Sequence, residues 1–144
     1  MATKIGGVGG GVTMPTGFNG HFRGFSGEIG FPEAVTTGFT DLGFASAIPV
    51  GGIRNTGSVS GVLVFDSSTT QPIPDALADG SGLALGDLAS CTGTLTLTIT
   101  TGCTLAGSHN ITSLGYSRQE DAEATGEWRY GSSGALTIVW DETT

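Results

Sequence analysis

The feature that most constrains this chain is a strict alternation of threonine with aliphatic residues over residues 94–100. Successive side chains of a β-strand point to opposite faces of its sheet. Leu95, Leu97 and Ile99 therefore share one face, and the four threonines share the other. The segment predicts a strand with one packed face and one face that meets water or a polar neighbour.

Similar alternation recurs elsewhere along the chain, which predicts six or so strands. The further segments are residues 25–31, 58–65, 111–116, 127–130 and 135–140. The last two flank a Gly-Ser-Ser-Gly run that is typical of a tight turn, so they are predicted to form a closing hairpin. Residues 73–78 contain a proline suited to a first helical turn, and they predict the only helix. We expect an antiparallel β-sandwich or barrel with one short flanking α-helix.

The length of 144 residues suits one domain with its own core. Residues 1–14 are rich in glycine and predict a flexible N-terminal arm, followed by a single β domain over residues 15–144. Within it, residues 32–56 form a loop longer than compact domains usually contain, and this loop carries many apolar side chains. Either it folds back on its own sheet or it packs on a neighbouring subunit.

The charge of the chain argues against tight nucleic-acid binding. Five Lys and Arg residues face 13 Asp and Glu, for a net charge of -8, so no basic surface for phosphate is expected. No apolar run resembles a signal peptide or a membrane helix, and we expect a soluble protein made in a cytoplasm. A strand between Cys91 and Cys103 would hold them apart, so both are predicted to be free thiols.

Residues that could carry chemistry are sparse and scattered. His21 and His109 each stand alone, without metal ligands at a suitable spacing. The acidic residues 120–123 lack the spacing of a calcium loop and predict a solvated turn. Residues 57–61 (GSVSG) contain the glycines and serines of a Gly-x-Ser-x-Gly elbow, but they fall in a predicted strand and have no acid and base partners. The sequence therefore predicts no enzyme, no metal and no cofactor.

The aromatic residues are also explained without a ligand. Tyr116, Trp128, Tyr130 and Trp140 all fall at predicted strand positions, where packing in the core accounts for them. A platform of exposed aromatic rings for sugars or bases is therefore not expected.

The order of these segments resembles that of the tail tube proteins of long-tailed bacteriophages. The resemblance begins at residues 11–17 (GVTMPTG) and continues through residues 35–43 (VTTGFTDLG) and 49–61 (PVGGIRNTGSVSG). The short helix, the strand at residues 94–100 and the final strands then follow in the same order as in that family. The resemblance spans nearly the whole chain, and it rests on the order and spacing of the segments.

This resemblance implies a structural virion protein of the phage tail, made in the host cytoplasm. Such subunits assemble into stacked hexameric rings around a channel through which DNA passes without specific binding, and their partners are further copies and other virion proteins. The long loop and the arm would bridge neighbouring subunits. The candidate interface residues are Val8, Val12, Phe39, Asp41, Phe44, Ile48 and Arg54.

Two other kinds of protein fit the same sequence. The nearest is a capsid decoration or tail-completion subunit of the same fold, which would stay small until a capsid or tail is present. The other is a ligand-binding β-sandwich for sugars, which would be monomeric and would expose an aromatic patch. An enzyme ranks behind both, because the sequence lacks converging polar groups.

Overall fold

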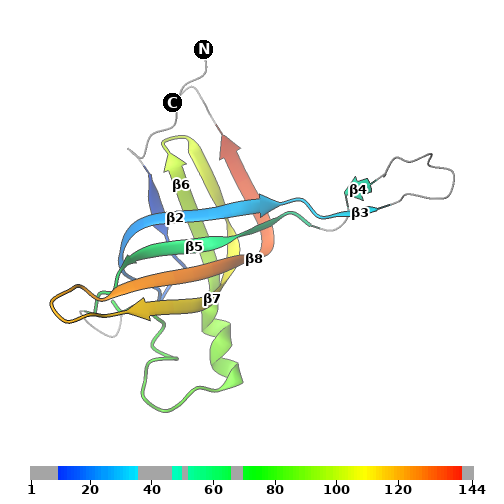
Figure 1. Cartoon of the computed structure of the whole chain (residues 1–144). Helices are drawn as coiled ribbons and strands as arrows, with labels where there is room; N and C mark the ends of the chain where they lie inside the picture. Colours follow the sequence, from blue (N-terminus) through cyan, green and yellow to red (C-terminus); the bar gives the residue numbers. More distant parts are fainter. Residues whose placement is uncertain (1–9, 36–46, 50–51, 66–69, 141–144) are drawn as a thin grey trace.

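The computed structural model describes residues 10–35, 47–49, 52–65 and 70–140, and it is mainly β. Six antiparallel strands form the main sheet in the order β1-β6-β7-β8-β5-β2 (Figure 1). Their bounds are β1 Gly11–Thr13, β2 His21–Gly30, β5 Arg54–Val62, β6 Thr92–Thr100, β7 Cys103–Ser117 and β8 Thr125–Trp140. Two further strands, β3 (Glu33–Val35) and β4 (Ala47–Pro49), pair with each other. The predicted class, an antiparallel β fold with one short helix, is confirmed.

The two longest strands, β7 and β8, belong to both halves of a curled sheet. Residues 103–110 of β7 pair with β6, whereas residues 125–131 of β8 pair with β5, and β7 and β8 pair with each other along their length. Two irregularities in the β7–β8 pairing, between Gly107 and His109 and between Ile111 and Ser113, mark the bend. Such bulges increase the local twist and turn a strand. The sheet therefore folds over itself, and its edge strands β1 and β2 come into contact.

The core lies between the two halves of the sheet. Leu95 and Leu97 of β6 are fully buried, as the threonine alternation predicted, and they contribute to the core with Val59 of β5 and Trp128 of β8. Burial of a large apolar side chain stabilises a fold by about 1.5–3 kcal/mol. Phe22 packs edge-on against Trp128, with ring centroids 5.1 Å apart. The inward-facing residues of strands far apart in the sequence thus hold the two halves together.

Four of the predicted strands are confirmed, but their ends differ from the prediction. The segments at residues 25–31, 58–65, 94–100 and 111–116 lie in β2, β5, β6 and β7. Phe31 and Phe65 fall beyond the strand ends, with exposed fractions of 69% and 71%. Residues 103–110, which were not predicted as a strand, form the first half of β7.

The predicted closing hairpin is wrong. Strand β8 runs without interruption through residues 131–134, and its hairpin partner is β7. Gly131 pairs with both Thr56 and Asn110, and Ser132 pairs with His109. The glycine and serine residues lie where β8 passes from one half of the sheet to the other, and their small side chains suit a bend as well as they suit a turn.

The position predicted for the helix is also wrong. Over residues 74–78 the backbone forms two successive turns, in which the amides of Leu77 and Ala78 donate to the carbonyls of Pro74 and Asp75 at 2.9 and 3.0 Å. The prolines at 72 and 74 leave no room for a longer helix, because each removes a donor and restricts the residue before it. The helix is instead a 3-10 helix, η1, at Leu85–Cys91.

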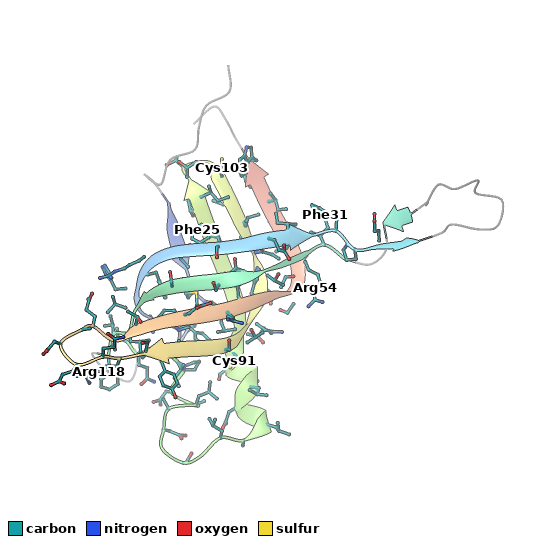
Figure 2. The ribbon with its side chains drawn as sticks, viewed as in Figure 1. Phe25, Phe31, Arg54, Cys91, Cys103 and Arg118 are labelled. Atoms are coloured by element: carbon teal, nitrogen blue, oxygen red, sulfur yellow. The ribbon has the colours of Figure 1, made fainter. Side chains whose placement is uncertain are left out.

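The hairpin between β6 and β7 fixes the positions of the two cysteines. Its turn contains Gly102 with a positive φ of 87°, a conformation that glycine adopts without strain. Cys91 precedes β6, and Cys103 pairs with Thr100 at the far end of that strand (Figure 2). Both thiols are free, which confirms the prediction.

Candidate assembly surfaces

Two of the seven candidate interface residues have described side chains. Val12 lies in β1, pairs with Leu97 and packs half-buried against the core of its own domain. The segment assigned to a flexible arm thus includes a strand of the main sheet at its end. Arg54 is exposed at the start of β5, opposite Gly30. Outside the described residues lie Val8, Phe39, Asp41 and Phe44, and also the side chain of Ile48 in β4.

The described part of the long loop projects away from the main sheet. Figure 1 shows β3 and β4 beyond the ends of β2 and β5, on a ribbon that leaves the body of the domain. At its base, Phe31 and Ile53 have exposed fractions of 69% and 50%. The sequence left open whether this loop folds back, and its two described strands do not cover the main sheet.

A buried polar cluster lies at the bend of β7. The amide Nδ2 of Asn55 is 3.2 Å from Nε2 of His109, and Nδ1 of His109 is 2.9 Å from the carbonyl of Gly107. Since a carbonyl only accepts, Nδ1 carries the proton and Nε2 accepts from Asn55. The ring of Tyr130 packs edge-on against His109 at 5.7 Å. His109 is thus a structural residue that joins β5 and β7.

The outer face of β2, β5, β8 and β7 carries an open hollow. This hollow, of about 460 Å³, is lined by Arg23, Ser60, Thr125 and Glu127 among others. Arg23 forms an exposed ion pair with Glu123 of the β7–β8 connection at 2.9 Å. This connection contains the acidic residues 120–123, as predicted. The described residues contain no group of three or more His, Cys, Asp or Glu side chains that could hold a metal ion.

The aromatic predictions divide into two pairs. Trp128 and Tyr130 are in the core, as predicted, with exposed fractions of 0% and 3%. The prediction is wrong for Tyr116 and Trp140, whose exposed fractions are 83% and 53%. Both lie near the ends of long strands, where β7 and β8 each have a partner on one side only. Alternation places a side chain on a face, and it does not show how far the opposing layer extends.

Two exposed apolar surfaces were not predicted from the sequence. One is at the start of η1, where Leu83, Leu85 and Leu88 are exposed, and the other is at the end of β8, around Ile138 and Trp140. The only signal for the first was a leucine-rich run between an aspartate-glycine turn and a strand. In the described part of the chain no helix is long and apolar enough to cross a bilayer.

The fold defines the general class, a curled antiparallel sheet with a projecting two-stranded segment. Neither a protein-family model nor a curated protein matches the chain. Among solved structures it is similar to a chain in the "tail of empty GTA particle computed with helical refinement, C6 symmetry". The TM-score is 0.57 with 20% identity, over 83% of this chain and 82% of the other.

A second solved structure supports the same fold. It is a chain in the "virion of native gene transfer agent (GTA) particle", with a TM-score of 0.57 and 20% identity, over 82% of this chain and 84% of the other. The chain therefore shares the fold of subunits found in gene transfer agent particles, which agrees with its resemblance to phage tail proteins.

Proposed function

We propose that this protein is a non-enzymatic structural virion protein, the subunit of a phage-type tail tube. One observation carries the proposal: the fold matches a chain from a tail of C6 symmetry over more than four fifths of both chains. Six copies related by such an axis form a closed ring through heterologous contacts, and stacked rings form a tube. The channel would deliver DNA from the particle to the cell.

The segment that contains β3 and β4 would bridge neighbouring subunits in this assembly. Its projection from the main sheet supports this role, because such a segment can reach a neighbour without unfolding its own domain. Arg54 lies at its base, and Phe39, Asp41, Phe44 and Ile48 belong to the same loop. Of the arm residues, Val8 keeps its proposed role between subunits, whereas the contacts of Val12 lie within its own domain.

The acidic charge suits passage of DNA without capture. A net charge of -8 per subunit is multiplied in a ring, and like charges repel the phosphate backbone. Its partners would be further copies of this chain and other virion proteins, and it would be located in the tail of the particle.

Negative-stain electron microscopy, with light scattering over a range of protein concentrations, tests the proposal directly. We expect rings or hollow tubes of the purified protein. A charge placed at the base of the projecting segment, Ile53→Asp, should reduce assembly, whereas Phe65→Asp provides a matched exposed control. A protein that remains monomeric at high concentration would contradict the proposal and favour a decoration protein or a binding module.

A further inference from the structure

The first of two unexplained apolar surfaces is a leucine tip formed by Leu83, Leu85 and Leu88. Their exposed fractions are 76%, 88% and 57%, and η1 has no buried residue. The first turn of η1 is nevertheless stabilised by a hydrogen bond, in which the amide of Ala84 donates to the carboxylate of Asp87 at 2.9 Å. These large apolar side chains lie on an ordered turn and are not buried by their own domain. Such a patch is typical of an interaction surface.

The second surface is an open groove between β2 and the far end of β6. It has a volume of about 400 Å³, and its apolar lining includes Phe25, Ile29, Leu97, Ile99 and Leu105. Paired residues of antiparallel strands point to the same face, so Ile138, opposite Leu105, extends this apolar face toward the free edge of β8. Trp140 extends it in the same way opposite Cys103.

The leucine tip and the open groove lie at opposite ends of β6. Helix η1 leads directly into Thr92, whereas Ile99 and the pairing of Cys103 with Trp140 are at the other end of the strand (Figure 1). Eight residue steps of β6 separate these ends by about 26 Å. Every copy therefore presents one protruding and one hollow apolar surface, near opposite ends of β6.

We propose that the leucine tip of one copy inserts into the open groove of a second copy, head to tail. Each such contact leaves a free groove at one end and a free tip at the other, so further copies can add in the same way along an axis. The charged residue that lines the groove is Glu28, so apolar burial and not charge pairing with Asp87 would stabilise this contact.

The size of the two surfaces determines how strong this contact can be. Three leucines present on the order of a few hundred Å² of apolar area, and a stable pair of proteins needs about 1,000 Å² or more in total. One contact is therefore too weak to hold two single copies together. Six such contacts between two rings act together as one multivalent contact. The insertion of tip into groove is therefore the contact that stacks one ring on the next, and this inference rests on the proposed ring.

Three variants test this pairing. Leu85→Asp places a charge on the tip, Ile138→Asp places one beside the groove, and Tyr116→Asp is a control at a side chain with an exposed fraction of 83% elsewhere. All three changes are at exposed positions, and circular dichroism should show that each variant folds. We expect both test variants to form rings that do not stack, and the control to form tubes.

Mixing the preformed rings of the two test variants gives the sharpest result. The tip variant keeps an intact groove and the groove variant keeps an intact tip, so the mixture should form stacks of two rings and no longer tubes. Tubes of normal length from either variant alone, or a mixture without two-ring stacks, would overturn the pairing and leave the tube proposal intact. A wild-type protein that forms no rings would overturn both.

A second measurement does not depend on the groove variant. Trp140 has an exposed fraction of 53% in the single copy, whereas Trp128 is fully buried. Quenching of tryptophan fluorescence by acrylamide should fall at least twofold when wild-type rings stack, and Trp140→Phe should remove this change. Equal quenching of rings and tubes would overturn the inference.

Discussion

The side-chain amide of Asn55 lies 3.2 Å from Nε2 of His109, and both residues are almost completely buried. Asn55 begins the inward face of β5, and His109 lies at the bend of β7, so this hydrogen bond joins two strands that are not neighbours in the sheet. The backbone amide of Asn55 also donates to the hydroxyl of Ser132 in β8 at 3.0 Å. Asn55 thus contacts both long strands where the sheet curls.

Replacing Asn55 with leucine should destabilise the fold. The change keeps the volume of the side chain but leaves the acceptor of His109 buried without a donor, which costs about 1–3 kcal/mol. Urea denaturation of the single copy measures the loss. Asn110→Leu is the control, because Asn110 is exposed and its side chain accepts from the hydroxyl of Thr92 at 2.6 Å, so this change should cost less than about 1 kcal/mol. Equal losses in the two variants would contradict the role of the buried pair.

Gly57 should not tolerate even alanine. A Cβ atom there would lie within 3.0 Å of the carbonyl oxygen of Ser26 and of the hydroxyl of Tyr130. Overpacking of this kind costs about 1–3 kcal/mol or more, because backbone must move. Gly24→Ala in the paired strand meets only the Ser60 hydroxyl at 3.8 Å and should change stability by less than about 0.5 kcal/mol. Thermal denaturation of both variants decides whether close approach of β2 and β5 requires the glycine.

Stability should fall at alkaline pH because of Tyr130. Burial raises the pKa of its hydroxyl, so the folded protein keeps this proton at a pH where the unfolded chain, with a pKa of about 10, loses it. The contribution to stability is complete below pH about 10 and is lost as the pH rises through the folded pKa. Tyr130→Phe removes the donor to Ser26 and should cost about 0.5–1.5 kcal/mol at neutral pH. Above pH about 10 its stability should decline less than that of the wild type, and parallel curves would contradict this assignment.

Two truncations should separate the role of β1 from that of the residues before it. Removing residues 1–9 leaves β1 intact, so the free energy of unfolding should change by less than about 0.5 kcal/mol. Removing residues 1–13 also deletes Val12, which packs against the core, and should cost a further 1–2 kcal/mol or so. Chemical denaturation measures both values. If the proposed role of Val8 is correct, the shorter truncation should still weaken tube formation, which light scattering reports.

Individual elements show why some predictions succeeded and others failed. The strand at residues 94–100 was predicted correctly because both of its faces follow from local alternation, and Leu95 and Leu97 are buried as expected. The hairpin at residues 131–134 was predicted wrongly because glycine and serine suit a turn and a bend equally well. Only the pairing of Gly131 with strands on both sides distinguishes the two.

The candidate surfaces were harder to predict than the strands. Val12 lies in a glycine-rich segment that was predicted to be an arm, but it pairs with Leu97 from a strand more than 80 residues later. No surface was predicted at the leucine tip, and Trp140 was predicted to lie in the core. Whether such a side chain is covered depends on how far the opposing half of the sheet extends. The local sequence pattern does not show that extent.

The sequence by itself determined the β class, the inward faces of the main strands, the free cysteines and the acidic charge, because each depends on residue type and short-range periodicity. The tertiary structure decided the continuous β8, the bend at His109, the place of β1 in the sheet and the exposure of the leucine tip and the open groove. These features arise from pairing between distant segments, and the free energy of that pairing depends on which surfaces the folded chain brings together.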